Sequence, residues 1–168
     1  MKKLLSIVVL SMLGFAQLRA EFGGIAQVGD KPFAFSGVAT DGKAISLDAL
    51  KGKVVVVYFF SSRRNIGLME LRQIQERVWP VFQSRGLVIV CISRETDASE
   101  LARATQGMQI QFPLIPDPKQ EIFSHYASKG EPRAYLIGKD GTIKLVSLGY
   151  TDDEVDRIAF WIGKELDR

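Results

Sequence analysis

The chain has 168 residues, of which 46% are hydrophobic and 24% charged, with one cysteine and one histidine. This length and apolar content suit one globular domain and exclude a disordered tail. A single cysteine excludes an intramolecular disulfide and a CxxC redox pair, and a single histidine beside it excludes a compact Cys/His zinc site. Residues 1–20 hold three of the 22 basic residues and none of the 19 acidic ones, so residues 21–168 carry 19 of each. That balance argues against a nucleic-acid partner, which would need a basic surface.

The first 20 residues have the pattern of a secretory signal peptide. Lys2 and Lys3 precede an apolar stretch over residues 4–16, and Ala20 offers a small residue at a cleavage point. The stretch is shorter than the roughly 20 residues that a spanning helix needs, so we expect cleavage rather than retention as a membrane anchor. Residues 1–20 are therefore predicted to be a signal peptide and residues 21–168 an exported domain, periplasmic if the source is a Gram-negative bacterium. A membrane contact is expected only through an uncleaved signal segment.

Hydrophobic periodicity predicts strands and helices along residues 21–168. The predicted strands cover residues 36–39, 43–47, 54–60, 87–92, 133–137 and 143–148. The predicted helices cover residues 68–82, 97–108, 119–127 and 151–166. Pro80 should kink or end the first helix near Trp79. Residues 113–118 hold three prolines and are predicted to form a loop.

Capping boxes support two of these helices, with Asp97 and Glu100 at one start and Thr151 and Glu154 at another. The two long apolar strands, 54–60 and 87–92, are typical of strands buried on both faces of a sheet. The order predicts one α/β domain, with a central mixed β-sheet flanked by helices on both faces and an N-terminal β-hairpin extension.

The element order and several local motifs resemble the thioredoxin-like superfamily. The resemblance is to its redoxin branch, which holds TlpA-like exported thiol-disulfide oxidoreductases and AhpC/TSA peroxiredoxin relatives. The motifs that carry the resemblance are residues 28–33, 47–53, 54–62, 112–117 and 130–141. The last is the most specific, because the family has a Gly-x-Pro, then an apolar strand, then Asp-Gly. The resemblance extends over about residues 28–166 and implies a thioredoxin fold.

The resemblance also shows what this sequence lacks at the family's active site. The family has a Cys-x-x-Cys pair where the first long strand turns into its helix, and here Arg64 and Gly67 stand at those two positions. A reactive cysteine preceded by Thr or Ser at three residues is absent as well. We therefore assign no catalytic residue, no metal and no cofactor. Cys91 lies within a predicted buried strand and is expected to act as a small hydrophobe.

Two other polar residues receive structural interpretations. His125 lies on a short polar helix and is expected to be a surface residue. Glu70 occupies the position of a helix glutamate that tunes the active-site thiols in TlpA-like oxidoreductases. Without thiols to tune, we expect Glu70 to be an exposed helix acid.

The resemblance implies that Glu131–Pro132 is a cis bond beside the helix N-terminus. Arg63 and Arg64 would lie in the first helical turn with Ser62 as its cap. The predicted groove is therefore made by six residues: Ser62, Arg63, Arg64, Asn65, Glu131 and Pro132. Arg64 could pair with Glu131, or Arg63 and Arg64 could bind a small anion from a ligand or partner, or both arginines could point into water.

Three function classes follow. The favoured one is a redox-inactive binding or accessory module for a peptide or protein client in the cell envelope. The second is a divergent thiol-disulfide oxidoreductase or peroxiredoxin-like antioxidant that acts through Cys91 and an external thiol. The third is a structural domain in a larger envelope assembly.

Overall fold

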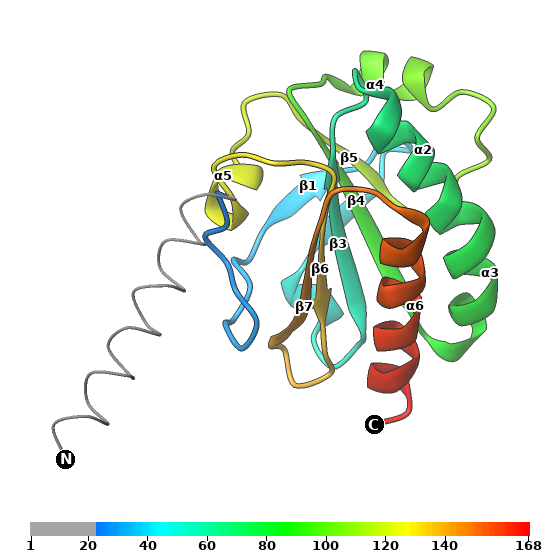
Figure 1. The fold of residues 1–168 in the computed structure, drawn as a ribbon. Coiled ribbons are helices and arrows are strands. Elements are labelled where there is room, and N and C mark those ends of the chain that lie inside the picture. The colour runs from blue at the N-terminus through cyan, green and yellow to red at the C-terminus, as the bar shows by residue number, and fades with distance from the viewer. Residues whose placement is uncertain (1–22) are drawn as a thin grey trace, which may run out of the picture.

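The computed structural model describes residues 23–168, so the predicted signal peptide lies outside the described residues. A five-stranded sheet with the order β5-β4-β3-β6-β7 forms the centre of the molecule (Figure 1). Its strands are β3 (Val55–Phe60), β4 (Val88–Arg94), β5 (Leu114–Asp117), β6 (Arg133–Ile137) and β7 (Ile143–Leu148). Because β3 pairs in parallel with β4 and antiparallel with β6, the sheet is mixed, as the sequence predicts.

Helices cover one face of this sheet. They are α2 (Asn65–Gln73), α3 (Trp79–Phe82), α4 (Ala98–Ala104) and α6 (Asp152–Leu166), with a π turn at Ile74–Val78 and a 3-10 turn at Gln83–Arg85. Alternate residues of β3, among them Val56 and Tyr58, pack against Leu71 of α2 and Ile158 of α6. Side chains alternate along a strand, so the other residues of β3 face the opposite side. Within residues 23–168, none of the helices is both long and apolar enough to cross a membrane.

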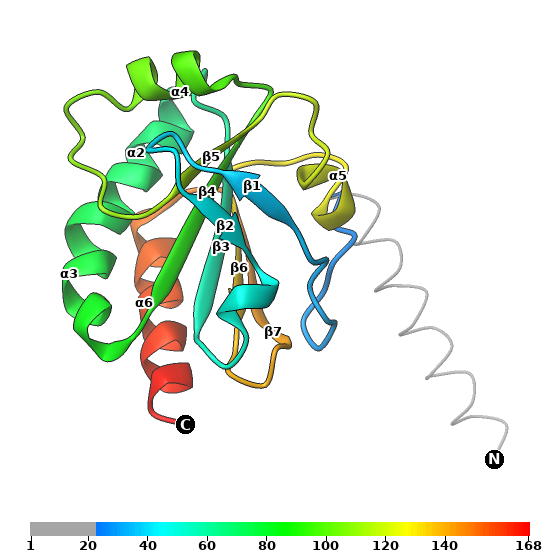
Figure 2. The same cartoon turned by 180° about the vertical axis from the view of Figure 1, so that it is seen from behind.

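A β-hairpin and a short helix cover the opposite face of the sheet (Figure 2). The hairpin is β1 (Ser36–Val38) and β2 (Ala44–Ser46), followed by the 3-10 turn η1 (Asp48–Leu50), and the helix is α5 (Phe123–Tyr126). Phe59 of β3 packs against Phe123 and Tyr126 of α5, with ring centroids 5.4 and 5.0 Å apart. The predicted hairpin extension and the helices on both faces are confirmed.

Prolines account for two differences between prediction and structure. Residues 114–117, predicted as part of a loop, form β5 at the edge of the sheet, where a proline such as Pro116 is tolerated. Pro80, predicted to kink or end the helix near Trp79, lies in the first turn of α3, which begins at Trp79 directly after the π turn. The chain therefore stays helical through Pro80, and the regular α-helix ends earlier, at Gln73. The predicted helices 97–108 and 119–127 are shorter, at 98–104 and 123–126.

Candidate functional site

The candidate site lies where β3 turns into α2. Arg64, not Ser62, is the N-cap of α2, and its backbone is extended while its N–H donates to the Ser61 carbonyl at 3.1 Å. The helix begins at Asn65 and has no side-chain cap. The prediction that Ser62 caps a helix containing both arginines is therefore wrong. The Ser62 hydroxyl cannot cap because it is hydrogen-bonded to another loop.

That loop follows β4 and contributes a small cluster of buried hydroxyl groups. The Ser62 hydroxyl lies 3.0 Å from the hydroxyl of Thr96, and the Ser93 hydroxyl donates to Thr96 at 3.1 Å. The Ser62 N–H also donates to the Ser93 hydroxyl at 3.3 Å. Buried polar groups are stable only when hydrogen-bonded, so this cluster fixes the β3–α2 turn against the end of β4.

Arg63, which precedes α2, pairs with a carboxylate of α4. Its Nε and Nη2 donate to the two carboxylate oxygens of Glu100 at 2.6 and 2.9 Å, a bidentate arrangement. The hydrogen bond from Arg63 lowers the pKa of Glu100 below its usual value. An anion that bound Arg63 would have to displace this carboxylate.

Glu131 is the centre of a second ion-pair group, and its side chain is only 5% exposed. Arg64 Nε lies 3.4 Å from Glu131 Oε1, which is one of the three arrangements left open by the sequence. A closer contact comes from Arg94 at the end of β4, whose Nη1 donates to Glu131 Oε2 at 2.5 Å. Arg94 also donates to Glu95 at 2.8 Å and lies over the ring of Phe123. Arg94 is not among the residues that the sequence predicts for this site.

The register of the sheet explains how Arg94 reaches this site. Phe60 of β3 lies opposite Ser93 of β4 in a parallel pair, so the residues that follow both strands meet at one edge. In the sequence, the charged residues Arg94 and Glu95 come at the end of a long apolar run. That pattern could have indicated that they lie at the site.

The loop before β6 brings Glu131 to the site. The Glu131–Pro132 bond is cis, as the resemblance implies, and Arg133 is buried at the start of β6. Asn65, one of the six predicted groove residues, also lines a hollow of about 620 Å³ beside α2. Leu68, Met69 and Tyr150 contribute its apolar surface. The hollow is therefore next to the predicted groove and shares one residue with it.

Glu70 is buried beneath α2, and the prediction of an exposed helix acid is wrong. Its side chain faces β3, where the Tyr58 hydroxyl donates to Glu70 Oε2 at 3.0 Å and to the Gly67 carbonyl at 3.2 Å. Burial raises the pKa of Glu70 to about 8, although the hydrogen bond from Tyr58 opposes that rise. At neutral pH the carboxyl group is therefore mostly protonated. The residue lies on the inner face of α2, which a single acidic position in a helical pattern does not reveal.

Gly67 allows α2 to lie close to the end of β3. A Cβ atom at this position would lie 3.1 Å from the Ser61 carbonyl oxygen and 3.2 Å from the Cβ of Phe60. Such contacts are tighter than ordinary van der Waals distances, so a larger residue would require a small shift of the helix. The position that a resolving cysteine occupies in the family is therefore packed for glycine.

The single cysteine lies far from solvent. Cys91 is in the middle of β4, opposite Tyr58 on one side and Leu114 on the other, and it is fully buried. Burial first, and the neighbouring Glu70 second, raise the pKa of its thiol well above the ordinary value. Because the thiolate is the reactive form, both effects oppose nucleophilic chemistry. The prediction that Cys91 is a buried hydrophobe agrees with this placement.

His125 lies on α5, exposed to solvent, and its ring stacks on Phe33 with centroids 3.5 Å apart. This agrees with the expected surface position. Among residues 23–168, no three His, Cys, Asp or Glu side chains come together as a metal-binding group would require.

The fold and this strand-to-helix site define the chain as a thioredoxin-fold protein of the redoxin type. A family model, the AhpC/TSA family, matches residues 28–146. The chain belongs to the AhpC/TSA family.

The relatives of this chain include both peroxiredoxins and thiol-disulfide oxidoreductases. A putative peroxiredoxin of Mycobacterium tuberculosis (strain H37Rv) is 29% identical over 116 residues, 69% of this chain and 73% of that protein. The thiol-disulfide oxidoreductase ResA of Bacillus subtilis is 25% identical over 146 residues, 85% of this chain and 80% of that protein. A putative protein disulfide isomerase of Bacteroides thetaiotaomicron has a similar structure, with a TM-score of 0.83 and 26% identity, covering 88% of this chain and 94% of that one.

Proposed function

We propose that this chain is an exported, redox-inactive member of its family that binds a peptide or protein client. The observation that carries the proposal is the chemistry of the β3–α2 turn. Arg64 and Gly67 stand where the family has its cysteine pair, and the single thiol, Cys91, is fully buried in β4. The names of the relatives describe thiol chemistry, and these residues offer no thiolate for it. Export is supported by the signal-peptide pattern of residues 1–20.

The client surface would extend from the predicted groove across the α2 start. The groove residues are Ser62, Arg63, Arg64, Asn65, Glu131 and Pro132. Beside them, Ile66 and Met69 of α2 are 43% and 55% exposed, and Met69 lines the hollow that Asn65 and Tyr150 share. Exposed apolar residues next to a hollow with a polar rim are typical of a site that receives an apolar side chain of a partner. The Arg63 and Arg64 ion pairs are solvent-exposed on the arginine side, so they can exchange with a client carboxylate at little cost in free energy.

Binding of an unfolded polypeptide without thiols tests this proposal. The probe is fluorescein-labelled insulin B chain with its cysteines carboxymethylated, measured by fluorescence anisotropy. We expect saturable binding that Met69→Glu weakens by about tenfold, the effect of losing about 1.4 kcal/mol from one buried apolar contact. Val81→Glu is the matched control because Val81 is 56% exposed on α3 and lines neither the groove nor the hollow. Absence of saturable binding, or equal weakening by both variants, would contradict a client site at α2.

One alternative has support from the family itself: a divergent oxidoreductase or peroxidase that uses Cys91 and an external thiol. This mechanism requires the Cys91 thiol to reach solvent, which means moving the helices over this face of the sheet, because Cys91 packs in one core cluster with Leu71 of α2 and Leu101 of α4. The third class, a structural domain in a larger assembly, would leave the α2 hollow without a ligand. Measurements of polypeptide binding at α2 and of thiol turnover together distinguish all three classes.

A further inference from the structure

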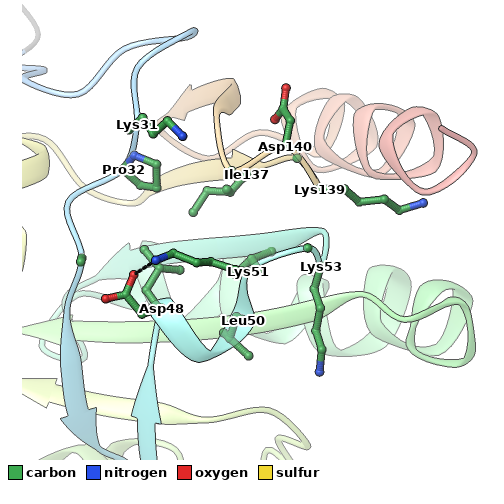
Figure 3. Close-up of a pocket in the computed structure, with 15 residues that line it drawn as sticks. Lys31, Pro32, Asp48, Leu50, Lys51, Lys53, Ile137, Lys139 and Asp140 are labelled. Atoms are coloured by element: carbon green, nitrogen blue, oxygen red, sulfur yellow. Dashed lines mark ion pairs between the residues drawn. The ribbon is translucent and has the colours of Figure 1, made fainter.

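A second cavity lies at the opposite end of the sheet from the β3–α2 turn. It has a volume of about 390 Å³ and is bounded by the residues before β3, the β6–β7 turn, the turn η1 and the segment that precedes β1 (Figure 3). The α2 site follows the last residue of β3, and this cavity contains Val55, the first residue of that strand. A six-residue strand is roughly 20 Å long, so a ligand in one site does not touch the other.

Lysines dominate the charge of this cavity. Four lysines line it, Lys31, Lys51, Lys53 and Lys139, against two acids, Asp48 and Asp140. Since residues 21–168 carry equal numbers of basic and acidic residues, this is a local concentration of positive charge. The cavity therefore favours an anion.

The two acids neutralise only part of the charge of the lysines. Asp48 pairs with Lys51, and Lys139 donates to the Leu166 carbonyl at 3.0 Å, but Asp140 pairs with a lysine outside the lining. Lys144, which is not among the lining residues, donates to Asp140 at 2.6 Å. That contact, with two hydrogen bonds from Thr142, lowers the pKa of Asp140 strongly. Within residues 23–168, Lys31 and Lys53 form no ion pair with an acid. The positive charge of the cavity therefore exceeds the charge of its own acids.

One lysine is already placed across the cavity. Figure 3 shows Lys51 extended toward Asp48, with a distance of 2.8 Å between Nζ and the carboxylate. Both side chains are more than half exposed, so this pair contributes at most about 1 kcal/mol. An anionic ligand can replace Asp48 as the partner of Lys51 without a large loss.

The walls of the cavity are apolar. Figure 3 shows Pro32 and Ile137 on the upper side of the cavity, and Leu50 on the lower side. Leu47, Val55 and Ala34 add to the apolar lining. A site with an apolar interior and a few charged groups binds ligands that have an apolar body and a charged end. A bare inorganic anion would leave the apolar walls without a partner.

We propose that this cavity binds a small organic anion with an apolar body, such as an aromatic or aliphatic carboxylate, sulfonate or phosphate ester. The anionic group would lie against Lys31 and Lys51, and the apolar body would pack against Pro32 and Ile137, because Figure 3 shows Lys53 extended away from these residues. This inference does not depend on the client site at α2, because the two sites share no residue.

The test uses 1-anilinonaphthalene-8-sulfonate as the probe, with binding followed by fluorescence and by amide NMR shifts of the purified protein. We expect one saturable site whose largest shifts fall on Gly52, Gly138 and Gly141, three glycines that line the cavity. The double variant Lys31→Gln/Lys51→Gln should weaken binding about tenfold or more. Lys43→Gln is the matched control, because Lys43 also pairs with a nearby aspartate and is 77% exposed, as Lys51 is.

A second variant tests the apolar part of the site without changing its charge. Ala34 is exposed at the cavity wall, so Ala34→Leu should fill the space and weaken probe binding while leaving the circular dichroism spectrum unchanged. Inorganic phosphate should compete only weakly. No saturable binding, shifts on α2 instead of the three glycines, or competition by phosphate at the affinity of the probe would each overturn the proposal.

Discussion

Replacing Arg94 with Met is expected to lower the free energy of unfolding by about 3 kcal/mol. The variant keeps an apolar side chain of similar length over Phe123 but leaves the Glu131 carboxylate, 5% exposed, without its close partner. Breaking a buried ion pair at one side is strongly destabilising because the remaining charge has lost its compensation. Urea unfolding at pH 7, followed by circular dichroism, measures the difference.

Arg64 provides the matched control on the same carboxylate. Arg64 is 64% exposed and lies 3.4 Å from Glu131, so Arg64→Met should change the free energy of unfolding by less than about 0.5 kcal/mol. The double variant Arg94→Met/Glu131→Gln should recover most of the loss, because neither charge then remains unpaired. If Arg94→Met and Arg64→Met lowered the free energy of unfolding equally, the close pairing of Arg94 with the buried Glu131 carboxylate would not be the cause of the destabilisation.

Replacing Glu70 with Gln is expected to stabilise the protein, increasingly so at higher pH. The pKa of Glu70 is about 8 in the folded protein, above the usual value of 4.5 in the unfolded chain. Between these two values the folded protein binds one proton more than the unfolded chain, so stability is lost as pH rises through this range. A glutamine side chain at this position would keep an acceptor for Tyr58 and has no charge to bury. We expect the variant to gain about 2–4 kcal/mol at pH 8.5 and little at pH 4.5.

The control for this series is Glu76→Gln, an exposed acid in the π turn that follows α2. It should leave both the stability and its pH dependence nearly unchanged. Urea unfolding at pH 4.5, 6.5 and 8.5 on the three proteins gives the comparison. If Glu70→Gln shows the same pH dependence as the parent protein, Glu70 does not titrate in this range and the account of its burial is wrong.

Much of the fold could be predicted from the sequence because the signals were local. Residues 54–60 and the hairpin 133–148 have the β-branched runs and Asp-Gly turns that strands and hairpins require, and they form as predicted. The Asp97 and Thr151 side chains accept hydrogen bonds from the N–H groups of Glu100 and Glu154, which is one half of each predicted capping box. The Glu100 and Glu154 carboxylates pair with Arg63 and Arg157 instead. The edge strand β5 was missed because proline usually indicates a loop. It is compatible with a strand only at the edge of a sheet, and the sequence does not show which strand lies at the edge.

The candidate site could be predicted only in part. The resemblance places the loops of Arg64 and Glu131 together, but it left open whether Arg64 pairs with Glu131, binds an anion or points into water. The role of Arg94 depends on the parallel register of β3 and β4, and the burial of Glu70 depends on which face of α2 meets the sheet. Both are tertiary facts that a single sequence does not contain. The same reason applies to Ser62, whose hydroxyl is held by Thr96 from a different loop.

We propose above that this member of the AhpC/TSA family performs no thiol chemistry. The most direct test is the reduction of insulin disulfides by dithiothreitol, followed as turbidity, with and without the purified protein. A thioredoxin is the positive control for the assay, and Arg64→Cys/Gly67→Cys restores the missing pair in this scaffold. We predict that the natural protein leaves the reduction rate unchanged and that the double variant accelerates it. Acceleration by the natural protein that Cys91→Ser abolishes would contradict the claim, because it would place a reactive thiol within reach of solvent in β4.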